Sequence, residues 1–341
     1  MKDKLNILFL GANGGNALKR FKALGRLGHD VMLIDPYSLF PFRNFVGRLI
    51  YYAGASLIES YLKLKIDPII NKCIFDVVFV DNGEFVGCSV LSMLKKVSPI
   101  IINYNNDDPF GTRDKKKWRL YREAVPRYDL LAVVRPVNVA EAYALGAPKV
   151  LQVFMAVDEL DGPREITPQD RSRFPHEVLF IGTWMPERGP FLQELMKAGV
   201  PLAIYGNNWQ KAPEWPALQS AWHGPAIYGD DYLKAIQLAK VSLGLLSKGN
   251  RDLHTTRTFE IPYCGGVFCA ERTSEHLQLY QEDVEAVYWG DVEECIEKCK
   301  KLLDDDKMRT AIAENGRIRC LHNGIFNENN LKNILSTALS E

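Results

Sequence analysis

The chain has 341 residues, a length that predicts two domains of roughly 100–200 residues each. Hydrophobic residues make up 47% and charged residues 25% of the sequence, as in globular proteins, and this composition excludes a disordered or low-complexity chain. Lys plus Arg and Asp plus Glu both number 42, so the formal net charge is zero, which argues against a nucleic-acid-binding protein.

The cysteines and the N-terminal residues indicate the cellular compartment. The 7 cysteines form no C-x-x-C pair and are irregularly spaced, so neither a zinc site nor a disulfide framework is indicated. The N-terminal residues lack the layout of a signal peptide, and no uncharged apolar run approaches the ~20 residues of a membrane span. We therefore expect a cytoplasmic protein.

The first half of the chain alternates short apolar runs with stretches of helical spacing. Strands are expected at residues 5–10, 31–34, 77–80, 100–104, 130–134 and 150–153. A helix is expected over residues 16–27, where apolar side chains recur at the helical period before Gly28. This alternation predicts a doubly wound, parallel α/β domain over residues 1–157.

Residues 158–175 interrupt this pattern, because they are polar and contain three prolines, and we expect a linker there. The alternation restarts with strands expected at residues 178–181, 202–205, 241–245, 267–270 and 286–288. Helices are expected at residues 189–198, 230–239, 256–263, 292–303 and 307–320. A second Rossmann-like domain is therefore expected over residues 176–325. A last helix within 326–341 is a candidate for packing back on the first domain.

A glycine-rich turn, residues 11–16 (GANGGN), leaves the first strand and opens the first helix. That is the position of a phosphate-binding turn, and Asp35 ends the next strand, where dinucleotide folds place a ribose-binding acid. The G-x-G-x-x-G spacing is not met, because Asn13 and Asn16 stand where glycines are needed. Three interpretations stay open: an NAD-dependent oxidoreductase, an ordinary connection, and a loop on the acceptor or diphosphate side of a cleft.

Asp107 and Asp108 come directly after the strand expected at residues 100–104. Two adjacent carboxylates can raise each other's pKa, which suits a general base, and either residue is a candidate for this role. The competing interpretation is a turn, because Asp108 precedes Pro109 and aspartate often caps the next element. Metal binding is the weaker alternative, since no third ligand is evident.

Polar side chains follow two strands of the second domain. Gly182 ends the strand at residues 178–181, and Arg188 lies near the start of the next helix, where a guanidinium could hold a diphosphate. Lys248 follows the strand at residues 241–245. A surface arginine and a flexible turn are the alternatives for these two positions.

The segment from His254 to Gly266 is the most distinctive in the chain. The hydroxyls of Thr255 and Thr256 could cap a helix start and leave backbone N–H groups free for an anion. Glu260 lies about one turn further, from where a carboxylate could accept both ribose hydroxyls of a nucleotide. The alternative is a capped, buried helix that ends at Gly265 and Gly266.

Residues 257–266, with the pattern R-x-F-E-I-P-x-C-G-G, resemble the CgeB-like (spore-maturation type) glycosyltransferases of the GT-B fold. Further agreement lies in the segments 205–209, 241–245, 284–288 and 308–317. The resemblance covers about residues 178–320; in the first domain it is limited to the layout and to Asp107, Asp108 and Pro109.

The resemblance implies two Rossmann-like domains that face each other across a cleft, with a nucleotide-sugar donor on the second. It implies no cofactor and no bound metal, since positive side chains and helix N-termini would stabilise the leaving diphosphate. The donor-binding candidates are Gly182, Arg188, Gly206, Lys248, Asp252, Thr255, Thr256, Arg257 and Glu260. Glu260 resembles the ribose-binding acid; UDP, GDP and dTDP are not distinguished.

The sequence departs from the resemblance at one position. Many retaining GT-B enzymes carry E-x7-E, but the residue eight positions before Glu260 is Asp252. Retention and inversion of the anomeric configuration therefore both stay open. If inversion holds, Asp107 or Asp108 is the base expected to deprotonate the acceptor hydroxyl.

Residues 41–52 and 61–65 mix aromatic and basic residues. They could meet a lipid-linked acceptor at the inner membrane surface, although a core-facing helix with a basic outer face is the simpler interpretation. We expect a glycosyltransferase that acts on a glycan or glycoconjugate, in bacterial surface-polysaccharide assembly. The alternatives are the NAD-dependent oxidoreductase and a non-catalytic nucleotide-binding relative.

Overall fold

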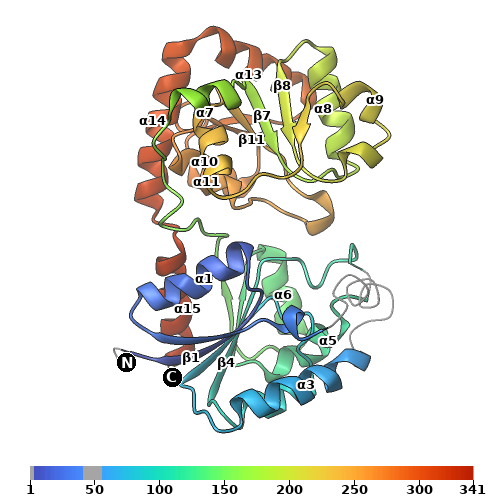
Figure 1. Ribbon diagram of the computed structural model, residues 1–341, viewed down its shortest axis with the longest axis vertical. Coiled ribbons are helices and arrows are strands. Elements are labelled where there is room, and N and C mark those ends of the chain that lie inside the picture. The colour runs from blue at the N-terminus through green and yellow to red at the C-terminus, as the bar shows by residue number, and fades with distance from the viewer. Residues whose placement is uncertain (1–3, 41–55, 115, 341) are drawn as a thin grey trace. The chain divides into compact units, whose positions relative to one another are not determined.

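The computed structural model describes residues 4–40, 56–114 and 116–340. The chain forms two compact α/β units, each with a six-stranded sheet. Residues Met1–Asp158, Gly249–Arg251 and Phe326–Glu341 make up unit 1, and Glu159–Lys248 and Asp252–Ile325 make up unit 2. All the strand pairs of both sheets are parallel. The expectation of doubly wound α/β sheets is confirmed (Figure 1).

The sheet of unit 1 has the strand order β2-β1-β3-β4-β5-β6. Its strands are β1 (Asn6–Leu10), β2 (Asp30–Ile34), β3 (Val77–Asp81), β4 (Ile100–Asn105), β5 (Leu130–Val133) and β6 (Val150–Gln152). In the register of the sheet, Leu8 lies opposite Met32 on one side and Val78 on the other. The order reverses between β1 and β3, and in open α/β sheets ligands bind at such a point.

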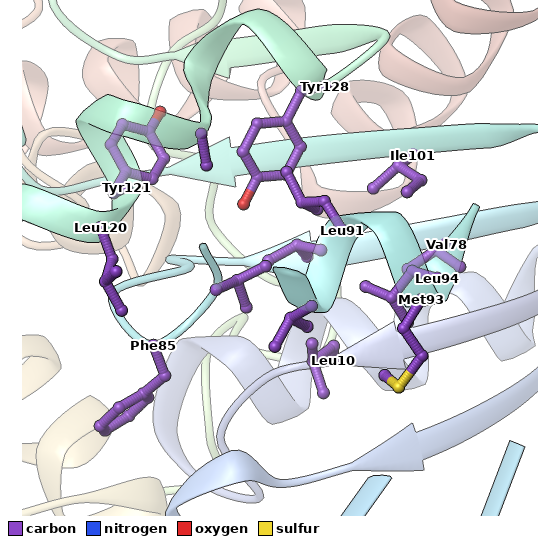
Figure 2. Packing of buried hydrophobic residues seen from close by; sticks show 14 of the residues in the cluster. Leu10, Val78, Phe85, Leu91, Met93, Leu94, Ile101, Leu120, Tyr121 and Tyr128 are labelled. Carbon is purple, nitrogen blue, oxygen red and sulfur yellow. The ribbon is translucent and has the colours of Figure 1, made fainter. Parts of the chain in front are cut away.

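Helices cover both faces of this sheet. They are α1 (Gly15–Arg26), α3 (Ser56–Ile70), α4 (Cys88–Leu94), α5 (Arg119–Ala124), α6 (Pro136–Ala144) and α15 (Asn327–Leu339), with the 3-10 turns η1 (Pro36–Leu39) and η2 (Val125–Arg127). Figure 2 shows the apolar packing on one face, where Leu91 and Leu94 of α4 meet Val78 and Ile101 of the sheet. On the other face, α15 packs beside α1 and buries its apolar side chains against β4 and β5.

The sheet of unit 2 has the strand order β12-β11-β10-β7-β8-β9, which is the order of a dinucleotide-binding fold. Its strands are β7 (Val178–Ile181), β8 (Leu202–Tyr205), β9 (Trp222–Gly224), β10 (Val241–Gly244), β11 (Phe268–Glu271) and β12 (Val287–Trp289). The four inner strands and β12 were expected from their apolar runs. The order reverses between β7 and β10, so the point at which a ligand is expected lies between these two strands.

The helices of unit 2 are α7 (Pro168–Arg173), α8 (Arg188–Lys197), α9 (Trp215–Leu218), α10 (Gly229–Leu238), α11 (Arg257–Tyr263), α12 (Ser274–Leu279), α13 (Val292–Asp304) and α14 (Asp306–Asn323). The short helix α7 lies inside the segment expected to be a linker. Thr167 caps it, because its hydroxyl accepts from the Asp170 N–H and the Asp170 carboxylate accepts from the Thr167 N–H.

The basic and aromatic segments expected on the acceptor side are only partly described. Residues 41–52 lie outside the described residues, whereas 61–65 lie in α3. There Leu62 and Ile66 are fully buried, and the Lys65 ammonium lies 5.4 Å from the centre of the Tyr61 ring. Within the described ranges, the chain has no helix with the length and apolar character needed to cross a membrane.

Candidate functional site

Arg188 occupies the point where the strand order of unit 2 reverses. It is the first residue of α8, and its guanidinium donates to the Thr183 carbonyl at 3.0 Å and to the Leu245 carbonyl at 3.1 Å. Thr183 follows β7 and Leu245 follows β10. The charge is therefore held between the carboxyl ends of the two strands at which ligands of such sheets bind.

A second guanidinium lies near Arg188. Burial, followed by the positive charge of Arg257, lowers the pKa of Arg188 to about 10, although Glu187 and Asp252 act in the opposite direction. The Nε atoms of Arg188 and Arg257 are both buried and lack a hydrogen-bond partner within the described residues. Two neighbouring guanidiniums with unused donors form an environment that favours a phosphate-like anion.

Gly182 and Gly206 bring the loops after β7 and β8 into backbone contact. A Cβ atom on Gly206 would lie 1.9 Å from the Gly182 carbonyl oxygen, and one on Gly182 would lie 3.4 Å from the Arg188 Nη1 atom. The Trp209 indole also donates to the Gly182 carbonyl, at 2.9 Å. These two glycines, expected to bind the donor, therefore also keep this edge of the sheet closely packed beside Arg188.

The expected cap of α11 by Thr255 and Thr256 is wrong. Thr256 is the N-cap residue, but its backbone is helical and its side chain makes no capping hydrogen bond. The Thr255 N–H instead donates to the Thr258 hydroxyl at 3.2 Å. The hydroxyl of Thr258 also lies 3.0 Å from the His276 Nε2 atom. Because a tertiary contact orders this helix start, a local threonine cap is not needed.

Glu260 is buried within α11, as expected of a side chain one turn after the helix start. One of its carboxylate oxygens accepts from the Tyr232 hydroxyl at 2.7 Å. Burial and the charge of Glu260 raise the pKa of Tyr232 well above its ordinary value, so this phenol stays a donor. Tyr232, which the sequence analysis did not propose, therefore orients the carboxylate expected to bind ribose.

A buried polar network supports the loop before α11. His254 Nδ1 lies 2.5 Å from a Glu275 carboxylate oxygen, and both side chains are almost fully buried. His276 Nδ1 lies 2.6 Å from the Glu271 carbonyl oxygen. Burial lowers the pKa of His276 to about 4, so its ring is neutral at pH 7. This network was not predicted, although His254 directly precedes Thr255 and Thr256 in the sequence.

The ammonium of Lys248, expected to bind a diphosphate, forms an ion pair within the chain. Its ammonium pairs with the Glu271 carboxylate, and its backbone N–H donates to Glu187 at 3.0 Å. The Asp252 N–H donates to the Ser247 carbonyl at 3.3 Å, and the negative charge of Asp252 partly opposes the lowering of the Arg188 pKa. Lys248 is therefore a weaker candidate for a diphosphate than Arg188 and Arg257, whereas Asp252 lies close enough to influence the guanidinium.

Asp108, one of the two candidate bases, is buried and fully engaged. Two nitrogens of Arg251 donate to it at 2.5 and 2.7 Å, Asn138 donates at 2.9 Å and the Gly111 N–H at 3.0 Å. Burial alone would raise its pKa, but the hydrogen bonds from Arg251 and Asn138 lower it. The expectation of a raised pKa is wrong for Asp108, because the charge beside it is a guanidinium rather than a carboxylate.

Asp107 points to a different group of residues and is partly exposed, at 26% of its side chain. Its carboxylate lies 3.5 Å from the Lys117 ammonium and 4.0 Å from the Arg113 guanidinium. Lys117 also pairs with Glu84 at 2.8 Å, and Glu84 accepts from the Tyr37 hydroxyl at 2.5 Å. These groups follow β2, β3 and β4, so Asp107 belongs to a charged cluster at one edge of the sheet.

Lys117, Glu84 and Tyr37 were not predicted. Burial alone would lower the pKa of Lys117, but the carboxylates of Glu84 and Asp107 raise it, so the ammonium remains charged. Glu84 comes shortly after the end of β3, and that position, at the carboxyl end of a parallel strand, is the signal that could have found it.

The glycine turn after β1 lies beside a buried ion pair. Arg20 of α1 donates to Asp81 at 2.6 and 3.0 Å, and a Cβ atom on Gly11 would lie 2.7 Å from that of Asp81. Asp35, expected to bind ribose in an oxidoreductase, accepts from the Tyr37 N–H at 2.9 Å. Its carboxylate therefore has a local role at the start of η1.

Metal-ligating side chains gather at one place within the described ranges. Three buried cysteines, Cys269, Cys295 and Cys299, form this group, and their sulfur atoms lie within 4.8 Å of one another. Asp107 and Asp108 do not belong to such a group in those ranges.

Comparison with known proteins gives a family model and solved structures. Residues 188–336 match the model of a family described as glycosyl transferase-like, a span somewhat shorter than half of the chain. It contains Arg188, Arg257 and Glu260. A search of curated protein sequences gives no match.

The structural matches extend over nearly the whole chain. The Anabaena protein HepE, in complex with UDP-glucose, is 13% identical with a TM-score of 0.69, and the match covers 98% of this chain and 99% of HepE. Sucrose-phosphate synthase from Thermosynechococcus elongatus is 11% identical with a TM-score of 0.69, over 97% of each chain. An α,α-trehalose-phosphate synthase (UDP-forming) from Burkholderia xenovorans, in complex with glucose-6-phosphate, is 12% identical with a TM-score of 0.66, over 98% and 100%. The fold is therefore that of the GT-B glycosyltransferases, as expected.

Proposed function

We propose that this protein transfers a sugar from a nucleotide-diphosphate donor to a hydroxyl group of a glycan or glycoconjugate. The observation that carries the proposal is the pair Arg188 and Arg257 at the reversal point of the unit 2 sheet, whose Nε atoms have no hydrogen-bond partner among the described residues. The match of residues 188–336 to a glycosyl transferase-like family supports it. The structures similar in fold include one in complex with UDP-glucose.

In the proposed reaction, the acceptor oxygen attacks the anomeric carbon, and the bond from that carbon to the diphosphate oxygen breaks. The nucleoside diphosphate leaves with the electron pair. Arg188 and Arg257 would stabilise the negative charge that develops on it, a role that metal ions fill elsewhere. Metal independence is therefore part of the proposal. Glu260, oriented by Tyr232, would accept the ribose hydroxyls.

We assign the acceptor proton to Asp107 rather than to Asp108. Asp108 is 3% exposed, and its oxygens accept from Arg251, Asn138 and Gly111. Asp107 is partly exposed and lies 3.5 Å from Lys117. A base must reach the proton that it removes, and the accessible carboxylate meets this requirement better. This assignment applies to an inverting reaction.

The proposal extends to the pathway and the cellular location of the protein. The CgeB-like resemblance of residues 257–266 supports a role in surface-polysaccharide assembly. The irregular spacing of the cysteines supports a cytoplasmic location, and the basic and aromatic residues 61–65 support a peripheral contact to the inner membrane. On α3, Leu64 is 68% exposed beside Lys63 and Lys65, a pattern that suits a membrane surface. Co-sedimentation with anionic vesicles tests this contact, and its absence would limit the proposal to soluble acceptors.

Isothermal titration with UDP, GDP and dTDP in a metal-free buffer tests the proposed function. We expect one of them to bind and its sugar esters to be hydrolysed slowly without an acceptor. Binding of none of the three would contradict the proposal. Binding without hydrolysis or transfer over a panel of donors and acceptors would favour a non-catalytic nucleotide-binding role.

A further inference from the structure

Unit 2 has a cavity of about 300 Å³ at the carboxyl ends of β10, β11 and β12. This volume lies at the lower end of the range for small-molecule sites, which is roughly 300–1,000 Å³. The twelve lining residues come from the start of α8, the ends of the three strands and the start of α13. None of the proposed roles of Asp107, Glu260 or Arg257 uses this cavity.

The lining combines an apolar part with polar side chains. Phe191 and Trp289 form the apolar part with Leu245 and Leu246, and the centres of the two rings lie 4.5 Å apart. Glu271, paired with Lys248, is among the polar side chains. Aromatic faces pack against the C–H groups of a sugar ring, and carboxylates and ammonium groups hydrogen-bond to its hydroxyls.

Arg188 joins this cavity to the proposed diphosphate site. Its side chain is among the residues that line the cavity, and it is also the guanidinium whose pKa the charge of Arg257 lowers. A diphosphate bound by both arginines would therefore have its next group, the transferred sugar, beside the cavity. The inference below rests on the proposed function in this respect.

The lining carries more negative than positive charge. Four acids, Glu187, Glu271, Asp291 and Glu293, line the cavity together with two cations, Arg188 and Lys248, which leaves an excess of two negative charges. A further negative charge bound beside these acids is repelled by them, which weakens its binding. A sugar that carries a carboxylate is therefore disfavoured here, whereas a neutral or amino sugar is not.

The N-terminus of α13 does not reverse this charge. The helix begins at Val292 beside the cavity, and its positive end could in principle attract a carboxylate. Asp291 already occupies that end, because its side chain accepts from the Glu294 N–H at 2.8 Å. Glu294 also accepts from the Gly290 N–H at 2.7 Å. The helix start is thus compensated by acids of the chain itself.

We propose that this cavity holds the sugar of the donor, and that its acidic lining selects a neutral or amino sugar and rejects a uronic acid. Glu271 and Glu293 are the specificity-determining residues. Trp289 and Phe191 supply the apolar surface for the ring.

The test uses the full-length protein and the nucleoside diphosphate that binds best among UDP, GDP and dTDP. Isothermal titration compares that nucleotide with its glucosyl and glucuronosyl esters. We expect the glucosyl ester to bind at least as tightly as the nucleotide alone, and the glucuronosyl ester to bind at least about tenfold more weakly than the glucosyl ester. Failure of all three nucleotides to bind would contradict the proposed function itself.

Two variants and a matched control complete the experiment. E271Q and E293Q each remove one negative charge from the lining, the second at an exposed position. Each should therefore reduce the difference in affinity between the glucosyl and glucuronosyl esters. E177Q is the control: Glu177 also pairs with a lysine, Lys240 at 2.7 Å, but it does not line this cavity. Equal affinity of the wild type for the two esters would overturn the inference. So would a gap that both cavity variants leave unchanged while the nucleotide still binds.

Discussion

Arg251 donates hydrogen bonds to both carboxylate oxygens of Asp108, a residue 143 positions earlier in the chain. The same guanidinium contacts Glu141 at 2.9 Å. Arg251 belongs to the short segment Gly249–Arg251, which clusters with unit 1 although its neighbours on both sides belong to unit 2. Asp108 therefore has a structural role in unit 1, and this relationship separates it from Asp107.

The variant D108N should lose stability. The asparagine amide has one acceptor oxygen in place of two, and it carries no charge to pair with Arg251. We therefore expect the free energy of unfolding to fall by about 1–3 kcal/mol. Urea unfolding followed by circular dichroism measures this. The control is D30N, because Asp30 pairs with Lys4 at an exposed site, where pairs contribute about 0–1 kcal/mol. Equal losses in the two variants would contradict the role of Asp108.

The contribution of Asp108 should depend on pH in a defined direction. Its pKa is lowered in the folded state, so its stabilisation is fully present above the unfolded-state pKa of about 3.9. It is lost as the pH falls through that value towards the folded-state pKa. The stability gap between wild type and D108N should therefore shrink between about pH 5 and pH 3. A gap that stays constant over this range would contradict the lowered pKa.

The variant D107N should affect turnover more than stability. If Asp107 is the base, loss of its carboxylate should slow transfer by about 10²–10⁴-fold, while nucleotide affinity changes little. Its contacts with Lys117 and Arg113 are long, at 3.5 and 4.0 Å, so the melting temperature should change little. Steady-state kinetics with the donor and acceptor, alongside calorimetry, separate the two effects. Unchanged turnover would refute the assignment.

The fold could be predicted because its signals are local. The apolar runs that form β3 and β7 are buried along their whole length, and such runs alternate along the chain with stretches of helical spacing. The exceptions were short elements: β9 has three residues and includes His223, which is exposed, so no apolar run marks it. Helix α7 was not predicted, because the prolines of residues 158–175 indicate a linker and the Thr167–Asp170 cap was not considered.

The site was predicted only in part, because its side chains depend on distant partners. The positions of Arg188 and Glu260 follow from strand ends and from a helix start, so the sequence indicates them. The choice between Asp107 and Asp108 depends on Arg251, and no spacing in the sequence reveals that pair. The predicted cap by Thr255 and Thr256 failed partly for this reason, since the Thr258 hydroxyl that accepts from the Thr255 N–H also contacts His276, 18 positions away.

Glu260 offers a test of the proposed nucleotide site. E260Q keeps the shape of the side chain but removes the charge that accepts ribose hydroxyls, so we expect nucleotide affinity to fall by about tenfold or more, since a hydrogen bond to a charged group contributes roughly 1.5–3 kcal/mol. Y232F, which removes the hydrogen bond to Glu260, should cause a smaller loss. Isothermal titration measures both. D107A should bind normally, and a larger effect of D107A than of E260Q would contradict the division of roles.

The close contact between Gly206 and Gly182 should make the stability of the protein sensitive to a side chain at position 206. In G206A the added Cβ atom would lie 1.9 Å from a backbone oxygen, so the clash cannot be relieved by rotating a side chain. The main chain must shift, and we expect unfolding to cost at least about 2 kcal/mol less. Urea unfolding followed by the fluorescence of the six tryptophans, among them Trp209, which donates to the Gly182 carbonyl, measures this loss of stability.

The matched control for that variant is G25A. Gly25 lies in α1, is exposed, and has no heavy atom within 4 Å of the position of an added Cβ. Alanine in a helix is favoured over glycine by roughly 1 kcal/mol, so this variant should be slightly more stable than the wild type. Because both changes add the same methyl group, opposite effects on the urea midpoint would isolate the backbone contact. A G206A protein as stable as the wild type would show that the loops after β7 and β8 can separate without cost.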